Sequence, residues 1–431
     1  MRSLSERLAL TRTVEQLSIS DHNATRLAHQ LVCETVRRKN LIDRFVNHAI
    51  WPDKIVEYEL GVQAFLRLYV YQTRLAGDWS KNNVKEAARI AGLGRAILGW
   101  KTMQKIEPYL GLLLTQKEKT IFEGASNENG TALRTFHPTW FVKYCFRLFG
   151  RREALRMLEA DTEQAPVYVR LNTLKAEENA VLERLEEEGV RLEKVEGLRH
   201  SYRVAVARQP LTSTSSFRQD LFYVQDKASC FAAEAANPRP GDTVLDVCAA
   251  PGAKTTYLAQ LMRNSGTIYS IDYSRRRMNV WKREVAHMGA TIANPLIADA
   301  RKPLPLILEA DVVILDPPCT STGTFRKLPS AKWRIRPRSI DKMAAFQWQM
   351  LDSLARNVRP EGTLIYSTCS ITIEENEMII ERFLKQHSEF SIVDVTPKIG
   401  LSGLRGLDKC QRLYPHIHDC NGSFIAKMQK E

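Results

Sequence analysis

Four short apolar runs, rich in β-branched residues, lie in the second half of the chain, and helix candidates follow the first two. The runs are residues 243–247, 267–272, 311–316 and 362–367. Such alternation is typical of a parallel sheet with helices on both faces. We therefore predict that residues 221–431 form an α/β domain, in which ligands bind at the carboxyl ends of the strands.

The preceding residues have a different pattern and predict two further domains, as expected for a chain of 431 residues. In residues 1–125 apolar positions recur every three or four residues, most clearly in 55–69, which predicts an all-helical domain. Residues 126–220 combine β-prone runs with one charged amphipathic helix (176–188), which ends at Gly189. This β-α-β-β order predicts a small α+β module.

A formal net charge of +13 indicates a polyanionic partner, because cationic side chains that contact phosphates release counterions. Solubility alone is the competing interpretation. No apolar run approaches the roughly 20 residues needed to cross a bilayer, and the polar segment 1–7 lacks the apolar core of a signal peptide. We therefore expect a monomeric nucleic-acid-binding protein of the cytoplasm, with no membrane partner.

The eight cysteines are dispersed and form no Cys-x-x-Cys cluster. Without a secretion signal a disulfide framework is not expected, and the ligand spacing of a zinc site is absent. We therefore expect reduced thiols and no bound metal, with most of the cysteines in the core.

A run of small residues follows the first predicted strand and precedes a helix. The positions concerned are Asp246, Val247, Cys248, Ala249, Ala250, Pro251, Gly252, Ala253, Lys254, Thr255 and Thr256. Small side chains let the backbone approach a ligand, and the amides at the start of the next helix can bind a carboxylate. The spacing matches neither a Walker loop nor Gly-x-Gly-x-x-Gly, and a purely structural turn is the alternative interpretation.

Asp272 ends the predicted strand 267–272, and Asp299 ends a further strand candidate that includes Ile297 and Ala298; both are candidates for cofactor contacts. Asp272 is placed to accept hydrogen bonds from both ribose hydroxyls of a nucleoside cofactor, although Ser274 and three arginines follow, so that a helix N-cap is the alternative. Asp299 is placed to face an adenine, and a loop aspartate is equally compatible with the sequence. Together with the small-residue run, Asp272 favours a nucleoside-cofactor site.

Two cysteines follow strands of the same predicted sheet. Cys319 closes the turn Asp316-Pro317-Pro318-Cys319, and Cys369 lies in Ser367-Thr368-Cys369-Ser370. A single cysteine in such a position is most often a buried core residue. Because the carboxyl ends of parallel strands share one edge, both thiols are expected over the cofactor crevice. The prolines stiffen one wall of it, and Asp316 is placed to bind a polar base edge.

These motifs resemble the Nol/Nop/Sun family of RNA cytosine-5 methyltransferases, in particular its bacterial-type Fmu/Sun ribosomal RNA members. The resemblance covers most of the chain and is carried by residues 137–140, 170–175, 246–255, 316–319, 367–370 and 421–427. The run from Ala249 to Gly252 and the two cysteines are highly specific in combination. The resemblance implies a Rossmann-like class I methyltransferase sheet, preceded by a small α+β RNA-recognition-like module and an all-helical NusB-like RNA-binding domain.

The resemblance also implies roles for individual residues. Cys369 adds to carbon 6 of a cytosine, which makes carbon 5 nucleophilic, and Cys319 assists release of the product through removal of the carbon 5 proton. The positions implied to contact S-adenosylmethionine are Cys248, Ala249, Ala250, Pro251, Gly252, Ala253, Lys254, Asp272, Asp299 and Asp316. Lys254 and Asp316 also lie near the target base by this resemblance.

Four positions depart from the usual family pattern without removing a catalytic group. Where Ser-Gly-Thr-Gly is common after the release cysteine, this chain has Thr320-Ser321-Thr322-Gly323, so that Ser321 adds a side chain beside the base pocket. Ala253 replaces a common Gly, which is a mild change if the backbone keeps negative φ. Asn421 and Ser423 replace a usual Asp and Phe.

Several basic segments are candidate phosphate contacts, although a solvated face is the usual explanation for each of them. They are residues 37–39, 151–152, 275–277 and 332–338. The last segment follows Cys319 and contains Trp333, Arg334 and Arg336, which can clamp an extruded nucleotide by stacking and by backbone contacts.

Methylation of small-subunit ribosomal RNA, and hence a part in rRNA processing, is the expected function, with transfer RNA as the second substrate class. A non-catalytic RNA-binding or ribosome-assembly factor is the alternative of another class, but a pure binder has no need for either cysteine. A DNA cytosine methyltransferase typically uses one cysteine in Pro-Cys-Gln, which is absent here. A nucleotide hydrolase would need a phosphate loop.

Overall fold

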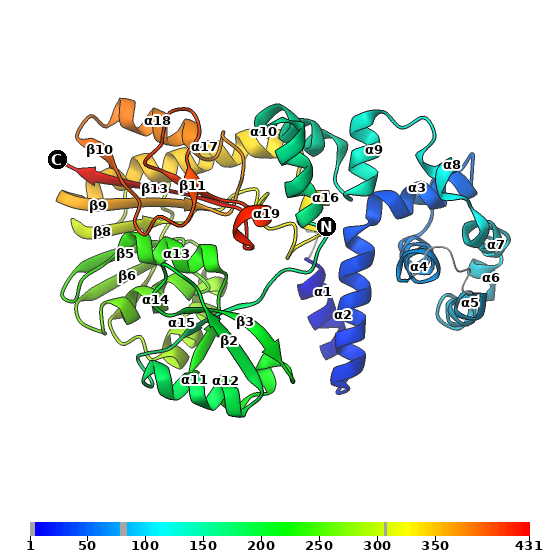
Figure 1. The fold of residues 1–431 in the computed structure, drawn as a ribbon, viewed down its shortest axis with the longest axis horizontal. Coiled ribbons are helices and arrows are strands. Elements are labelled where there is room, and N and C mark those ends of the chain that lie inside the picture. The colour runs from blue at the N-terminus through cyan, green and yellow to red at the C-terminus, as the bar shows by residue number, and fades with distance from the viewer. Residues whose placement is uncertain (1–4, 78–83, 306–307) are drawn as a thin grey trace. The chain divides into compact units, whose positions relative to one another are not determined.

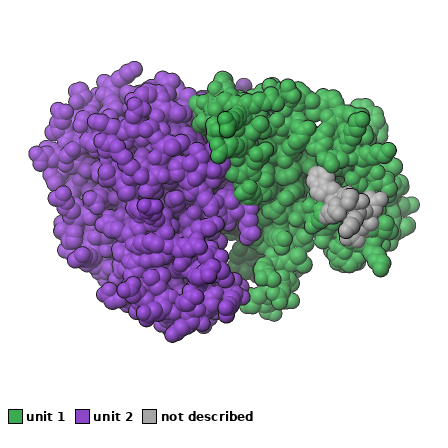
Figure 2. Space-filling view, in the orientation of Figure 1, with its two compact units in different colours: residues 1–163, 328–334 green, residues 164–327, 335–431 purple. Residues whose placement is uncertain are grey.

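The computed structural model describes residues 5–77, 84–305 and 308–431, and it divides the chain into two compact units (Figure 1, Figure 2). Unit 1 comprises residues 1–163 and 328–334, and unit 2 comprises residues 164–327 and 335–431. The short segment 328–334 therefore belongs to unit 1, although the residues on both sides of it belong to unit 2.

Unit 1 is helical in its described residues. Its elements are α1 (Glu6–Gln16), α2 (His22–Arg37), α3 (Lys39–Ala49), η1 (Ile55–Glu57), α4 (Leu60–Val70), η2 (Tyr71–Leu75), α5 (Val84–Leu98), α6 (Trp100–Met103), α7 (Glu107–Thr115), α8 (Glu118–Phe122), α9 (Asn127–Arg134), α10 (Thr139–Ala160) and α16 (Ala331–Arg334). Helix α4 covers most of the predicted amphipathic segment, and it buries Val62, Leu66 and Tyr69. These side chains join Phe45 of α3 and Leu113 of α7 in one core.

The first sheet of unit 2 has four antiparallel strands in the order β2-β3-β1-β4. Its elements are β1 (Tyr168–Leu171), α11 (Glu178–Glu187), β2 (Val190–Lys194), β3 (Ser201–Ala207), η3 (Leu211–Ser213), α12 (Ser215–Arg218) and β4 (Phe222–Val224). Leu171 of β1 packs with Val181 and Leu185 of α11. The predicted β-α-β-β order is present and is followed by a further helix and strand. The module starts after residue 160 because the helices of unit 1 continue past residue 125.

The second sheet of unit 2 has nine strands in the order β11-β12-β13-β9-β8-β5-β6-β7, with β10 paired to β13. They are β5 (Thr243–Val247), β6 (Thr267–Asp272), β7 (Ala293–Ile297), β8 (Ala310–Leu315), β9 (Val358–Thr368), β10 (Phe390–Val393), β11 (Leu401–Ser402), β12 (Gln411–Leu413) and β13 (Ser423–Lys430). The five strands from β7 to β9 are mutually parallel. Strand β13 runs antiparallel to β9.

Helices cover both faces of this sheet, as predicted (Figure 1). They are α13 (Lys227–Ala236), α14 (Ala253–Leu261), α15 (Arg275–Met288), α17 (Pro337–Leu354), η4 (Ala355–Asn357), α18 (Glu377–Gln386) and α19 (Pro415–His418). Successive strand residues point to opposite faces, so Val244 packs with α13, α14 and α15 while Leu245 packs with α17 and α18. The α/β fold class is therefore confirmed. In the described ranges no helix is long and apolar enough to cross a membrane.

Candidate active site

The carboxyl ends of five adjacent parallel strands gather the predicted site residues at one edge of the large sheet. Asp246 lies near the end of β5, Asp272 ends β6, Asp299 follows β7, Asp316 and Cys319 follow β8, and Cys369 follows β9. Because the strand order is β7-β6-β5-β8-β9, two aspartates lie on one side of β5 and both cysteines on the other. This arrangement follows the rule for ligand sites in open α/β sheets.

The small-residue loop between β5 and α14 is held in a defined conformation. Cys248 and Gly252 have positive φ values of 64° and 119°. Ala253 is the first residue of α14 and has no positive φ, so alanine in place of a common glycine introduces no backbone strain there. The Arg277 guanidinium donates to the carbonyl of Ala250 and lies 2.9 Å from Oδ2 of Asp272. This arginine of the 275–277 cluster therefore braces the loop.

A cavity of about 370 Å³ opens beside this loop. Its lining residues are Cys248, Ile271, Asp272, Tyr273, Ala298, Asp299, Ala300, Arg301, Pro318, Met343, Phe346 and Met350. Asp272 is buried, and among the described residues its Oδ2 atom accepts no hydrogen bond despite the nearby Arg277. Arg301 holds the Asp299 carboxylate with two donors at 2.9 and 2.6 Å and stacks over Phe346 at 5.0 Å. Apolar walls with a few convergent carboxylates are typical of a small-molecule site.

Asp246 holds the start of α14, the helix that follows the small-residue loop. It is buried and accepts a hydrogen bond of 2.5 Å from the Thr255 hydroxyl. Burial raises the pKa of Asp246 to about 6. Trp281 of α15 donates to the same hydroxyl at 2.9 Å, so this chain of contacts fixes the start of α14 against β5 and α15.

Lys254 and Asp316 form an ion pair between the first turn of α14, which follows the small-residue loop, and the Cys319 turn. The Nζ atom of Lys254 lies 2.5 Å from Oδ2 of Asp316. Burial opposes the charge of Lys254, but the adjacent carboxylate outweighs it and raises the lysine pKa. The lysine therefore stays protonated at neutral pH, and its positive charge favours an anion at Cys369.

The two predicted cysteines lie side by side, with 3.2 Å between their sulfur atoms. The hydrogen bond from Cys319 lowers the pKa of Cys369, whereas the same bond and burial raise the pKa of Cys319 well above its ordinary value. The two pKa values shift in opposite directions because the two adjacent thiols share one proton. When the pair loses one proton, the remaining proton therefore stays on Cys319 and the negative charge lies on Cys369.

Ser321 adds a hydroxyl next to this pair. Its Oγ atom lies 3.5 Å from the sulfur of Cys369 and 3.9 Å from that of Cys319. Ser321 has a φ of 56°, a left-handed conformation that glycine adopts without strain, which explains why glycine is common in this position of the motif. Gly323 in the same turn has no alternative, because a Cβ there would lie 2.0 Å from the carbonyl oxygen of Gly422.

The predicted RNA-clamp residues fall into different parts of the fold. Trp333 and Arg334 belong to unit 1, and Arg336 belongs to unit 2. The indole Nε1 of Trp333 donates to the Val36 carbonyl at 2.6 Å, so this edge of the ring is engaged within unit 1, while both arginines are exposed. Arg37, of another basic segment, is buried and donates to the Asp161 carbonyl at 2.7 Å. The phosphate contacts of these segments stay predictions.

Lys332, next to Trp333, is completely buried, and its Nζ atom has no hydrogen-bond acceptor among the described residues. Burial and the charge of Arg37 lower its pKa to about 7. Between pH 7 and the ordinary lysine pKa, the unfolded state then binds more protons than the folded state. The contribution of Lys332 to the free energy of unfolding therefore rises with pH across that window.

We therefore expect Lys332→Met to change the pH dependence of unfolding. Methionine removes the cost of burying a charge near pH 7, so the variant gains stability relative to wild type there, and this advantage shrinks as pH rises to 9. A difference of about 2 kcal/mol between pH 7 and pH 9 is expected, because the folded and unfolded states differ by nearly one bound proton over most of this window and one pH unit then corresponds to about 1.4 kcal/mol. Denaturant titrations at pH 7, 8 and 9 measure it, and parallel curves for the two proteins would contradict it.

Several residues of the site have no motif in the sequence. Met343, Phe346 and Met350 reach the cavity from α17, and their spacing of three and four residues marks one helix face without showing what that face contacts. Glu375, which follows the Cys369 turn, is completely buried and hydrogen-bonded to the turns that carry both cysteines. Among the described residues no group of three or more His, Cys, Asp or Glu side chains can hold a metal ion.

Comparison with protein families gives two matches along the chain. Residues 233–429 match the family described as 16S rRNA methyltransferase RsmB/F. Residues 137–209 match a ferredoxin-like domain described as RsmF/B-like. The first match contains the small-residue loop and both cysteine turns, and the second overlaps the four-stranded sheet.

Individual relatives extend these matches to nearly the whole chain. The chain is 28% identical over 433 residues to a probable ribosomal RNA small subunit methyltransferase B of Bacillus subtilis, covering 98% of this chain and 94% of that protein. A tRNA (cytosine(72)-C(5))-methyltransferase of Pyrococcus horikoshii is 34% identical over 221 residues, which cover 51% of this chain and 55% of that protein. The crystal structure of PH0851 superposes with a TM-score of 0.85 and 30% identity, covering 97% of this chain and 93% of that one.

Proposed function

The chain belongs to the RsmB/F family of 16S rRNA methyltransferases, and we propose that it transfers a methyl group from S-adenosylmethionine to carbon 5 of a cytosine in small-subunit ribosomal RNA. The share of the chain that each relative matches favours this choice of RNA. The small-subunit enzyme of Bacillus subtilis matches 98% of the chain, including the helical unit, whereas the transfer RNA enzyme matches only 51%. Transfer RNA is therefore the second candidate substrate.

The cavity beside the cofactor loop fits the proposed cofactor. Its volume of about 370 Å³ is in the range of small-molecule sites. The Oδ2 atom of Asp272 lies 2.9 Å from Arg277 but accepts no hydrogen bond among the described residues, so it can accept hydrogen bonds from ribose hydroxyls. Asp299 lies at the next strand end, and Phe346 supplies an apolar wall for a flat base. When bound, S-adenosylmethionine supplies the electrophilic methyl group.

The residues on the other side of β5 suit covalent activation of a cytosine. The Cys369 thiolate adds to carbon 6, and the new carbon–sulfur bond moves electron density to carbon 5. Asp316, held by Lys254 at 2.5 Å, accepts hydrogen bonds from the polar edge of the base. The lysine also screens the negative charges that gather in the site.

Cys319 is suited to complete the reaction. While Cys369 is an anion, its hydrogen bond and charge hold the proton on Cys319. Once the Cys369 sulfur is bonded to carbon 6, that charge is gone, and the Cys319 thiol can release its proton to solvent. After carbon 5 has received the methyl group, the Cys319 thiolate takes the carbon 5 proton, the carbon 6–sulfur bond breaks, and its electron pair returns to Cys369.

A methylation assay with defined RNAs tests the proposal. The protein is incubated with methyl-labelled S-adenosylmethionine and, separately, with small-subunit rRNA, assembled small subunits and total transfer RNA, and bisulfite sequencing then locates 5-methylcytosine. We expect one cytosine of small-subunit rRNA to be modified. Label in transfer RNA alone would replace the proposed substrate, and absence of label from all three would contradict the proposed activity.

We expect Asp272→Asn to weaken cofactor binding by about 10- to 100-fold, because hydrogen bonds to a charged group contribute roughly 1.5–3 kcal/mol each. Calorimetric titration with S-adenosylhomocysteine measures this without turnover. Asp311→Asn is a matched control: Asp311 lies at the amino end of β8 and pairs with Arg359 at 2.6 Å. Equal affinities for the Asp272→Asn variant and wild type would remove Asp272 from the proposed site.

We also propose that the enzyme acts as a monomer, without a metal ion, in the cytoplasm. Light scattering of the purified protein tests the first point and activity in excess chelator the second. A dimer mass, or loss of activity that a divalent metal restores, would contradict the respective proposal.

A further inference from the structure

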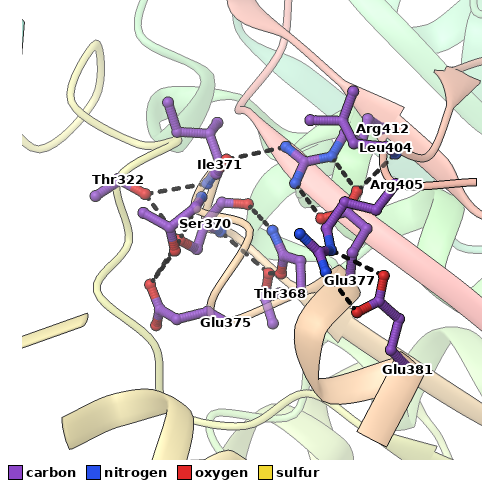
Figure 3. A network of polar contacts seen from close by, with 12 residues as sticks. Thr322, Thr368, Ser370, Ile371, Glu375, Glu377, Glu381, Leu404, Arg405 and Arg412 are labelled. Carbon is purple, nitrogen blue, oxygen red and sulfur yellow. Dashed lines mark hydrogen bonds and ion pairs between the residues drawn. The ribbon is translucent and has the colours of Figure 1, made fainter. Parts of the chain in front are cut away.

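Glu375 is a buried carboxylate that connects the two cysteine turns, and Figure 3 shows it beside Ser370 of the Cys369 turn. From the Cys319 side it accepts hydrogen bonds from the backbone amide of Thr320 at 2.8 Å and from the Thr320 hydroxyl. From the Cys369 side it accepts one from the Ser370 hydroxyl at 2.7 Å. Thr372 and Gln347 donate the remaining two, at 2.7 and 2.9 Å.

The partners of Glu375 are all neutral. Its side chain is 0% exposed, and none of its five hydrogen-bond donors in the described ranges is a cation. A buried anion without a counter-ion is costly, and only a full set of donors makes it tolerable. Residue 377, only two positions further, shows the usual solution, because the Glu377 carboxylate forms an ion pair with the buried guanidinium of Arg412 (Figure 3). An apolar residue in this position would accept none of these five hydrogen bonds, and a carboxylate paired with a cation would not need all of them.

The contacts of Glu375 and its neighbour Asn376 reach both sides of each cysteine. Gln347 bridges Glu375 to the Pro318 carbonyl at 2.9 Å, so that the residues before and after Cys319 are tied to one carboxylate. Asn376 accepts from the Thr368 hydroxyl at 2.6 Å and donates to the Ser370 carbonyl at 2.9 Å, which ties the residues before and after Cys369. One dipeptide therefore contacts the residues on both sides of each cysteine, in addition to direct bonds between the two turns such as that from the Gly323 amide to the Cys369 carbonyl at 3.0 Å.

We propose that Glu375 is a positioning residue that holds Cys319 and Cys369 at the separation at which they share one proton. The inference rests on the proposed function, which assigns different steps to the two sulfurs. Loss of the clamp lets the Cys319 turn move relative to Cys369. A misplacement of about 1 Å in a catalytic site can cost about 100-fold in rate.

Glu375→Gln tests the inference, because glutamine keeps the volume but presents an amide group to five donors. We expect kcat to fall about 100-fold with an RNA KM within threefold of wild type. We also expect a denaturant-resistant protein–RNA adduct to accumulate, since Cys319 no longer reaches the carbon 5 proton.

Glu377→Gln is the matched control. It also removes a completely buried carboxylate from the same segment, but its partners are Arg412 and the Leu404 amide and not the residues that flank the cysteines. We expect it to lower the melting temperature and to leave kcat of the folded protein within threefold of wild type. A kcat for Glu375→Gln within threefold of wild type, or equal losses in both variants, would overturn the inference.

A readout without RNA separates this inference from the proposed function. Alkylation of Cys369 by iodoacetamide, followed by peptide mass mapping across a pH series, reports the ionisation of its thiol. We expect the midpoint to rise in Glu375→Gln, because Cys319 no longer donates to Cys369, and to stay unchanged in Glu377→Gln. An unchanged midpoint in Glu375→Gln overturns the clamp even if the protein methylates RNA. A shifted midpoint in a protein that methylates no RNA supports the clamp and contradicts the proposed function.

Thr320→Val keeps the test decisive if Glu375→Gln does not fold. Valine removes the hydroxyl that donates to Glu375 and lies 3.3 Å from the Ser370 hydroxyl, and it leaves the carboxylate in place. We expect a smaller loss of kcat, about tenfold, with the same rise of the alkylation midpoint. Wild-type values for both measurements would overturn the inference.

Discussion

Replacement of Cys369 by alanine is expected to abolish methylation, with a fall in kcat of at least about 10⁴-fold, because loss of the nucleophile in covalent catalysis removes a whole reaction path. The environment of this sulfur supports a large effect. It accepts a hydrogen bond from Cys319 at 3.2 Å, and Lys254 supplies a positive charge nearby. No other thiol of the described residues combines these two features with a position over the strand ends.

Methyl transfer from labelled S-adenosylmethionine to small-subunit rRNA measures this expectation. Cys33→Ala is a suitable control, since Cys33 is a half-buried cysteine of the helical unit that forms no disulfide, and it should keep wild-type activity. Binding of S-adenosylhomocysteine to the Cys369→Ala variant should stay within threefold of wild type, which shows that the fold and the cofactor site are intact. Full activity of Cys369→Ala would reverse the assignment of the nucleophile.

Replacement of Cys319 by alanine is expected to have the opposite signature, an accumulation of covalent protein–RNA complex. Cys369 can still attack carbon 6, but the carbon 5 proton is no longer removed by a positioned base, a function that typically contributes about 10²- to 10⁴-fold. Release should therefore slow by about that factor. The complex is measured as a band of retarded mobility that survives denaturing electrophoresis and disappears after ribonuclease treatment.

The double variant Cys319→Ala, Cys369→Ala separates the roles of the two sulfurs. We expect it to form no complex, because the adduct needs the Cys369 sulfur. Complex formation in the double variant, or wild-type turnover in Cys319→Ala, would show that the division of labour between the cysteines is wrong.

Much of the large domain could be predicted from the sequence because each of its strands and helices has its own local sequence pattern. The runs at residues 243–247 and 267–272 became β5 and β6 with the predicted bounds, since a short β-branched run followed by a helix has few alternatives in an α/β sheet. The placement of Asp272, Asp316 and Cys369 at strand ends followed from the same local pattern.

Domain limits were harder to predict than strands. Helix α10 continues to Ala160, so the predicted boundary at residue 125 falls within unit 1. All amphipathic helices have the same spacing of apolar residues, so this spacing does not indicate to which domain a helix belongs. The segment 328–334 belongs to unit 1, although it lies between two stretches of unit 2. A segment that packs in a different unit from its sequence neighbours has no characteristic pattern of apolar residues. The basic residues around Trp333 favoured the prediction of a surface loop instead.

The sequence by itself determined that the two cysteines, three aspartates and the small-residue loop meet at one edge of a parallel sheet, because strand direction alone brings their carboxyl ends together. Only the tertiary structure decided how these groups interact. Cys319 and Cys369 are 50 positions apart, and their contact of 3.2 Å depends on strand register and on the packing of Glu375 between their turns. Side-chain distances of that size arise from the whole packed fold, so no local pattern encodes them.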